Sequence, residues 1–208
     1  MPKIGVITQA RMTSSRLPGK VLRELAGATM LEHHVQRLRA AGLEVFIATT
    51  INESDSLIVA EGARLGCGVY RGSEDDVLAR YAGTAQKFDL DVVVRVTSDC
   101  PLIDGELVKR GIDKFIELAD PVAFVSNTLE RSFPRGFDFE VMDARALFDA
   151  DRRATRPFER EHVTPFIYGS AGANILQITS EVDNSDLRLT LDTEKDFLLL
   201  REIFETYG

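Results

Sequence analysis

Short apolar runs alternate along the chain with segments whose apolar residues recur at helical spacing. Lys3–Thr8, Glu44–Thr50 and Asp91–Val96 are continuous apolar runs rich in β-branched side chains, which predicts buried strands. Between the first two, Met30–Ala41 has helical spacing and ends before Gly42. The same reading predicts further strands at Gly68–Tyr70, Ala123–Ser126, Ala173–Ser180 and Leu187–Leu191, and further helices at Ser54–Leu65, from about Ser73, and at Asp104–Leu118, Asp143–Arg153 and Thr193–Tyr207. Such alternation implies βαβ units, and therefore an α/β fold with three layers, a mostly parallel sheet flanked by helices as in Rossmann-like proteins.

The pattern changes after Asn127. Arg131–Gly136 reads as a turn, and Phe137–Val141 alternates in the manner of an edge strand, with Asp138 and Glu140 on its polar face. We therefore expect one domain over residues 1–208, with a small inserted lobe at about residues 127–172.

Composition narrows the class of protein. Hydrophobic residues make up 44% of the 208 positions, which is ordinary for a packed domain. The net charge of −8 argues against broad nucleic-acid binding, which needs a basic face. The two cysteines form no CxxC pair, and no apolar stretch reaches 18 residues. We expect a cytoplasmic protein with neither a nucleic-acid nor a membrane partner.

Against this acidic background, the loop after the first strand is basic. It carries Arg11, Ser14, Ser15, Arg16 and Lys20, with Pro18-Gly19 before the lysine. Triphosphate binding needs fixed positive charge, hydroxyl and backbone donors, and a sharp turn. The loop supplies all three, although it is neither a Walker loop nor a GxGxxG turn. A solvated basic loop paired with surface acids is the alternative.

The stretch ARMTSSRLPGK, residues 10–20, resembles the opening signature of the CMP-sugar synthetases, which include the CMP-KDO and CMP-sialic acid synthetases. Within them it is most similar to the branch called spore coat polysaccharide biosynthesis protein F. The resemblance implies a nucleotide-diphospho-sugar transferase-like fold whose first loop wraps the phosphates of CTP. It implies nucleotide-binding roles for Ala10, Arg11, Ser14, Ser15, Arg16, Lys20, Arg71 and Ser73, with Arg11, Arg16 and Lys20 acting in catalysis.

Two aspartates are candidate metal ligands. Asp99 follows the most hydrophobic strand, and Asp192 precedes the last predicted helix. Taken alone, Asp99 reads equally well as a turn residue, and Asp192 is better explained as part of the helix start. The resemblance implies that both bind Mg²⁺, because similar enzymes carry a strand-ending Asp before Pro-Leu and a late Val-Asp-Thr segment. Cys100 departs from the acidic residue common in CMP-KDO synthetases, which puts the acceptor in doubt more than the metal.

Other residues have two readings each. Arg71 and Ser73 are nucleotide contacts by resemblance, or simply belong to a capped helix start. Arg135, Asp138 and Glu140 are candidate acceptor-binding residues, Arg135 for a carboxylate and the two acids for hydroxyls. A strand with one wet face is the preferred explanation of the same residues. His162 is read as a structural histidine in preference to an acceptor contact.

The residues and the resemblance together predict a Mg²⁺-dependent cytidylyltransferase that transfers CMP from CTP to an acidic sugar or related acceptor, as a homodimer. The alternatives are a metal-dependent glycosyltransferase, disfavoured because Asp99 lies in no Asp-x-Asp pair, and a non-catalytic nucleotide-binding module. The acceptor itself is not specified by the sequence.

Overall fold

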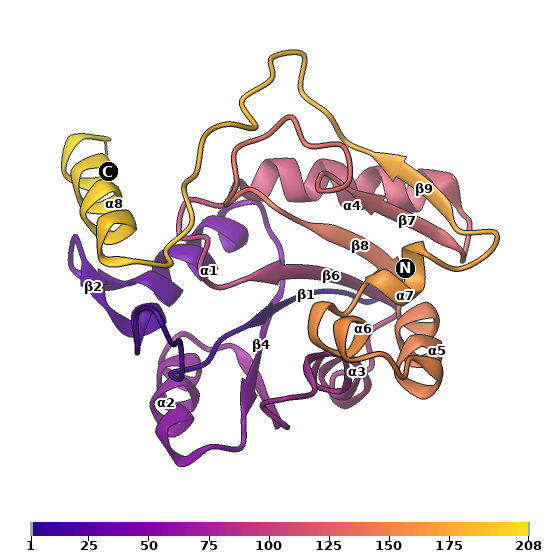
Figure 1. Cartoon of the computed structure of the whole chain (residues 1–208), viewed down its shortest axis with the longest axis horizontal. Helices are drawn as coiled ribbons and strands as arrows, with labels where there is room; N and C mark the ends of the chain where they lie inside the picture. The colour runs from indigo at the N-terminus through magenta and orange to yellow at the C-terminus, as the bar shows by residue number, and fades with distance from the viewer. Residues whose placement is uncertain (1, 208) are drawn as a thin grey trace.

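The computed structural model describes residues 2–207 and shows a sheet covered on both faces by helices (Figure 1). The sheet has seven strands in the described chain, in the order β5-β4-β1-β6-β8-β7-β9. Their bounds are β1 Ile4–Gln9, β4 Val45–Thr50, β5 Gly68–Gly72, β6 Val92–Thr97, β7 Ala123–Ser126, β8 Glu140–Asp143 and β9 Asn174–Gln177. A separate hairpin pairs β2 (Glu24–Leu25) with β3 (Ala28–Thr29). The expected mostly parallel α/β architecture is confirmed.

One strand runs against the rest of the sheet. β8 is antiparallel to both of its neighbours, β6 and β7. The prediction of an edge strand at Phe137–Val141 is therefore wrong in two ways. The strand lies inside the sheet, and it begins at Glu140, three residues later than expected. The polar residues that suggested a wet face are paired with arginines, as described below.

The two helical layers enclose two apolar cores. One face packs α1 (Met30–Ala40), α2 (Ser56–Arg64) and α4 (Gly105–Leu118). The other packs α3 (Val77–Lys87), α5 (Ala144–Arg153), α6 (Pro157–His162) and α7 (Pro165–Tyr168). Alternate residues of β6 serve the two cores: Val92 and Val94 point to the first, and Val93 to the second. Burial on both faces explains why the central strands read as continuous apolar runs.

The last helix, α8 (Glu194–Tyr207), begins with a reciprocal cap. Thr193 Oγ1 accepts a hydrogen bond from the backbone N–H of Asp196. In return, the Asp196 carboxylate accepts a hydrogen bond from the backbone N–H of Thr193 at 2.7 Å. This confirms the predicted helix start. The strand predicted just before it, Leu187–Leu191, is wrong, because the segment makes only one isolated bridge, between Arg135 and Arg188.

A small third core attaches α8 to the hairpin and to the start of α1, which places the helix beside β2 (Figure 1). Its buried members are Leu25, Met30, Leu191, Phe197 and Leu200. The guanidinium of Arg23 also stacks on Phe197, 3.7 Å from the ring centroid. Within the described residues, no helix has the length and apolar character needed to span a membrane.

Candidate active site

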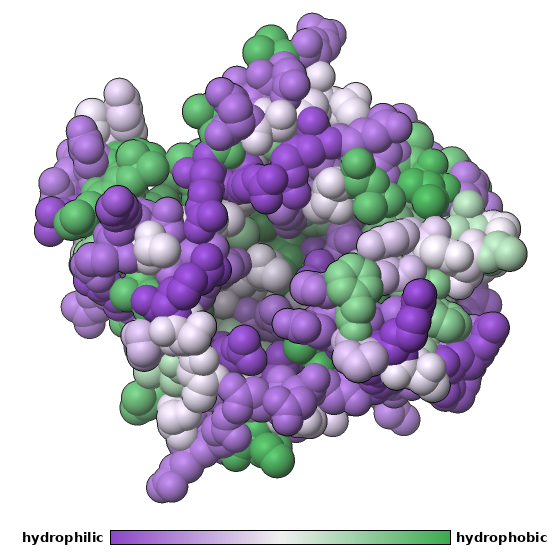
Figure 2. All heavy atoms as spheres, viewed as in Figure 1, coloured by the Kyte–Doolittle hydropathy of each residue, from purple (hydrophilic) through white to green (hydrophobic). Residues whose placement is uncertain are grey.

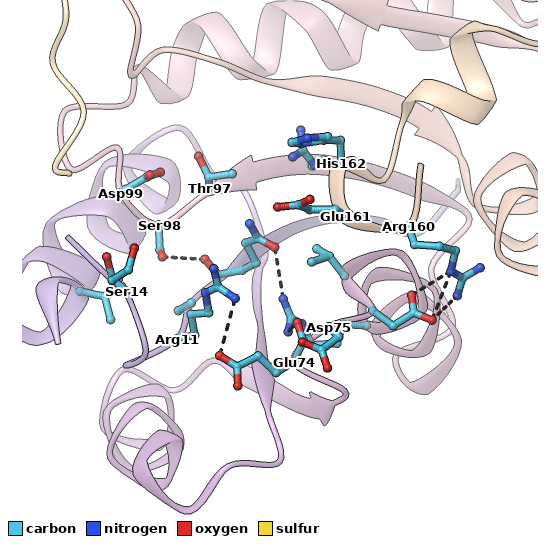
Figure 3. Close-up of a pocket in the computed structure, with 18 of the residues that line it drawn as sticks. Arg11, Ser14, Glu74, Asp75, Thr97, Ser98, Asp99, Arg160, Glu161 and His162 are labelled. Carbon is cyan, nitrogen blue, oxygen red and sulfur yellow. Dashed lines mark hydrogen bonds and ion pairs between the residues drawn. The ribbon is translucent and has the colours of Figure 1, made fainter. Parts of the chain in front are cut away.

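A cavity of about 870 Å³ opens where β1 and β6 end (Figures 2 and 3). Figure 2 shows a hollow near the middle of the face seen in Figure 1, with mostly hydrophilic residues around it. The predicted site residues that line it are Ala10, Arg11, Ser14, Ser15, Arg16, Lys20, Asp99 and Asp192. The structure therefore brings the basic loop and both aspartates to one cavity.

A buried aspartate holds the loop in shape. Asp55 accepts hydrogen bonds from the Met12 amide at 2.8 Å and from the hydroxyls of Thr49 and Thr50. Burial raises the pKa of Asp55, but these hydrogen bonds outweigh it and leave the pKa below its ordinary value. The loop turns back at Gly19, whose φ of 70° suits glycine and whose amide donates to the Met12 carbonyl.

Lys20 joins the two predicted metal ligands. Its Nζ donates to Asp99 Oδ2 at 3.1 Å, to Asp192 Oδ1 at 2.9 Å and to the Leu191 carbonyl at 2.7 Å. The exposed fractions of the three charged side chains are 12% for the lysine and 26% and 17% for the aspartates. Two carboxylates far apart in sequence thus converge on one largely buried ammonium.

Asp192 is held on both of its oxygens. Arg16 adds a second cation to Oδ1 at 3.0 Å, although its own side chain is 60% exposed. Arg188 donates to Oδ2 at 2.8 Å, and Asp196 accepts from the Asp192 amide at 2.9 Å. Because Arg188 holds one oxygen, the other is directed to Lys20 in the cavity.

Asp99 is fixed through its neighbours in the turn after β6. Its carbonyl accepts from the Leu191 amide at 2.7 Å, and the Cys100 carbonyl accepts from Nδ1 of the buried His34 at 2.9 Å. Burial raises the pKa of Asp99, but the Lys20 ammonium and the hydrogen bonds to the carboxylate, including one from Thr97, together outweigh it and leave the pKa below its ordinary value. Burial raises the pKa of the Cys100 thiol well above its ordinary value, which leaves that thiol protonated and argues against a nucleophilic role.

Two predicted nucleotide contacts, Arg71 and Ser73, are not among the described residues that line the cavity. Arg71 donates to the carbonyls of Thr50 and Asn52. The Ser73 carbonyl accepts from Arg80 at 2.8 Å. Both residues shape the segment beside the loop, and their contacts with nucleotide stay a prediction.

The three predicted acceptor residues also lie outside the cavity lining in the described structure. Arg135 pairs through its backbone with the loop before α8, and Asp138 accepts from Arg131 at 2.6 and 3.0 Å. Glu140 is 4% exposed and accepts from Arg95. The open, wet face considered for this segment is therefore wrong for Glu140, and the acceptor roles stay predictions.

Several cavity residues were not identified from sequence. They include Gln9, Arg80, Arg95, Thr97, Thr155 and Arg160. His162, for which the sequence favours a structural role, is exposed and lines the cavity, with its ring edge-on to Phe158 at 4.6 Å between centroids. The only signal for Arg95 was a charge inside an apolar strand.

The donor set fits a hard divalent cation. Residues 2–207 contain no group of three or more His, Cys, Asp or Glu side chains able to hold a metal. Mg²⁺ needs only one or two carboxylates when phosphate oxygens and water complete its shell. Asp99 and Asp192 supply that pair, and the Lys20 ammonium shows that positive charge is accommodated between them. The arrangement suits charge stabilisation on a polyphosphate.

Known proteins resemble this chain over nearly its whole length. The cytidylyltransferase family model matches residues 5–202. The spore coat polysaccharide biosynthesis protein SpsF of Bacillus subtilis is 31% identical, over 100% of this chain and 89% of that protein. A cytidylyltransferase structure from Leptospira borgpetersenii serovar Hardjo-bovis has a TM-score of 0.94 and 32% identity, covering 100% of this chain and 89% of that one. CMP:2-keto-3-deoxy-manno-octonic acid synthetase, solved with CTP, shares the fold, with a TM-score of 0.72, 19% identity and coverage of 99% and 100%.

Proposed function

This chain belongs to the cytidylyltransferase family, and on that premise we propose that it transfers CMP from CTP to an acidic sugar or a related acceptor, with release of pyrophosphate. The observation that carries the proposal is the convergence of Asp99 and Asp192 on Lys20, in the cavity formed by the basic loop. A family member that had lost its activity would have no need to keep this arrangement.

The loop binds the triphosphate. Arg11 and Arg16 are half exposed or more, and each contacts an acid at the cavity, Glu74 at 3.6 Å and Asp192 at 3.0 Å. Pairs this exposed are weak, so phosphate oxygens can replace the carboxylates at little cost. Ser14 and Ser15 add hydroxyl donors beside them. The cations thus exchange internal acids for the nucleotide.

Asp99 and Asp192 would hold Mg²⁺, which when bound would neutralise charge on the triphosphate. An acceptor hydroxyl oxygen forms a bond to the α-phosphorus, and the bond from that phosphorus to the pyrophosphate oxygen breaks. The hydroxyl proton passes to solvent. Lys20 and Arg16 stabilise the leaving pyrophosphate by charge, and Arg188 keeps the Asp192 carboxylate oriented. Catalysis by this chain is thereby positioning and electrostatics.

A pyrophosphate-release assay tests the proposal. The purified protein is given each of CTP, UTP, ATP and GTP with Mg²⁺, against a panel of acidic sugars and their neutral counterparts. We expect release with CTP and at least one acid. Lys20→Ala and Asp99→Asn should each lower the rate by about 10²-fold or more, the scale of one lost transition-state contact.

Other outcomes identify the rival functions. Stabilisation by a UDP- or GDP-sugar but not by CTP would indicate a glycosyltransferase. CTP binding without pyrophosphate release for any acceptor would indicate a binding module. Full turnover by both variants would refute the site assignment whatever the substrate. A homodimer and an acceptor-binding lobe at residues 127–172 belong to the same proposal, and light scattering tests the first.

A further inference from the structure

Arg95 is a charged residue in the middle of an apolar strand, and it lines the cavity. It lies on β6, beside Ile7 of β1 and Glu140 of β8. Its neighbours Val94 and Val96 are 0% and 1% exposed. A charge in such a place is costly unless it is paired or has a ligand to bind.

One side of the Arg95 guanidinium is fixed by the protein. Nη1 donates to Glu140 Oε2 at 2.5 Å, and the two side chains are 18% and 5% exposed. The other oxygen of Glu140 accepts from Thr164 Oγ1 at 2.9 Å. Arg95 also faces the Tyr81 ring at 5.9 Å, and the Tyr81 hydroxyl is tied to the Val96 carbonyl. The plane of the guanidinium is therefore set before any ligand arrives.

The remaining side of the guanidinium is unsatisfied. Nε is buried and has no hydrogen-bond partner, and Nη2 makes none of the hydrogen bonds found among residues 2–207. A buried donor without a partner is costly and rare, so it requires a reason. The Nε–H and Nη2–H bonds of an arginine point in one direction, and together they match the two oxygens of a carboxylate.

The other arginines that line the cavity are engaged or assigned. Arg11 and Arg16 belong to the phosphate-binding loop. Arg80 is 2% exposed; its Nη1 donates to two backbone carbonyls and its Nη2 to Gln9 Oε1 at 3.4 Å, although its Nε, like that of Arg95, is buried without a partner. Arg160 is held by both Asp76 and Asp151. Outside the loop, Arg95 is the one described lining arginine whose Nε and Nη2 both lack a hydrogen bond.

Arg95 lies two residues before Thr97 on β6. Figure 3 shows Thr97, on the same strand, and His162 across the cavity from Arg11. At about 3.3 Å per residue, the backbone of Arg95 is at most about 13 Å from that of Asp99, so both residues lie within reach of one small molecule in the cavity.

We propose that Arg95 binds the acidic group of the acceptor through Nε and Nη2, and that Glu140 is a positioning residue that acts only through Arg95. This rests on the proposed cytidylyl transfer and deepens it. The acceptor is then a small acid whose carboxylate is gripped by a guanidinium rather than by the metal. Binding of the acceptor carboxylate, which the sequence suggested for Arg135, is thereby assigned to Arg95 inside the sheet.

The test compares acceptor binding with nucleotide binding. The probes are 3-deoxy-manno-octulosonate and N-acetylneuraminate, with mannose as the neutral sugar, titrated calorimetrically into the protein, and CTP with Mg²⁺ titrated separately. We expect at least one acid to bind the wild type and mannose not to bind. Arg95→Lys keeps the charge beside Glu140 but loses the bidentate side, so it should weaken the acid at least tenfold and CTP less than twofold.

A second variant guards against misfolding. Arg95→Gln with Glu140→Gln removes both charges together and leaves neither unpaired, so its melting temperature should stay near that of the wild type while the acid is lost. Arg145→Gln, whose 77% exposed side chain pairs with Asp143 outside the cavity lining, is the matched control and should leave the affinity for both acid and CTP unchanged. Equal acid affinity in wild type and Arg95→Lys, equal losses for acid and CTP, or no binding of either acid would overturn the assignment. Failure of CTP to bind or react would instead overturn the proposed function.

Discussion

Replacing Lys20 by alanine should make the folded protein less stable and, at the same time, a better binder of free Mg²⁺. The lysine is the only described side chain that contacts both Asp99 and Asp192. Without it, two neighbouring carboxylates remain, neutralised in part by Arg16 and Arg188. The divalent cation then meets an unoccupied pair of ligands instead of displacing an ammonium.

The magnitude follows from burial. Exposed ion pairs contribute about 0 to 1 kcal/mol, and breaking a buried pair costs about 3 to 5 kcal/mol. With exposed fractions of 12%, 17% and 26%, the Lys20 contacts are intermediate, so we expect a loss of about 2 kcal/mol. In a chain of this length that lowers the melting temperature by roughly 6 °C. The same 2 kcal/mol, no longer spent on displacing the ammonium, strengthens Mg²⁺ binding roughly 30-fold.

The assay is thermal unfolding of the wild type and of Lys20→Ala over a Mg²⁺ titration without nucleotide. At about 100 times its dissociation constant, the ion raises stability by about 2.7 kcal/mol, which would restore the variant. Lys114→Ala, which removes a surface pair with Glu117, is the control and should shift little in either condition. A variant as stable as the wild type, or an equal Mg²⁺ response in both proteins, would show that Lys20 does not occupy the metal position.

Three further predictions concern the frame of the site. Burial lowers the pKa of His34 to about 4, so the folded protein resists protonation of this side chain. The free energy of unfolding should therefore fall by about 3 kcal/mol as the pH drops from 6.5 to 4. Urea denaturation at a series of pH values measures this fall, and His34→Leu should reduce it. Asp55→Ala removes the carboxylate that accepts a hydrogen bond from the Met12 amide, and so loosens the loop. It should raise the KM for CTP about tenfold with a smaller change in kcat, as measured by pyrophosphate release. Gly111→Ala would place a methyl group 2.1 Å from the Phe139 ring, so it should lower the free energy of unfolding in chemical denaturation by about 1 to 3 kcal/mol. In Gly27→Ser, by contrast, the added Cβ meets no atom within 4 Å, and the only strain comes from the φ of 81°.

The sequence predicted the sheet, the basic loop and both aspartates because each depends on local pattern. The apolar runs became β1, β4 and β6, and Asp99 follows β6 as expected. Asp192 lines the same cavity, but it does not end a strand as predicted. The segment before it is a loop, which one backbone hydrogen bond joins to Asp99.

What the sequence did not predict depends on contacts across the sheet. Placing β8 inside the sheet is what pairs Glu140 with Arg95, and a strand's polar alternation does not say which strand lies next to it. Asp55 was missed for the same reason, because its importance comes from the distant Met12 amide. His162 became a cavity residue only once α6 was packed on α3.

Because α8 must pack on the hairpin before Asp192 can reach Lys20, the site is completed late in folding. Lys20 and Asp192 are 172 positions apart, and the second reaches the first only when the final helix has packed on the hairpin near the start. During synthesis, Lys20 leaves the ribosome 172 residues before Asp192, so the contacts that join them form only after α8 has been made. In the folded protein, any ligand that contacts both Lys20 and Asp192 should hold α8 against the hairpin and protect this helix from proteases.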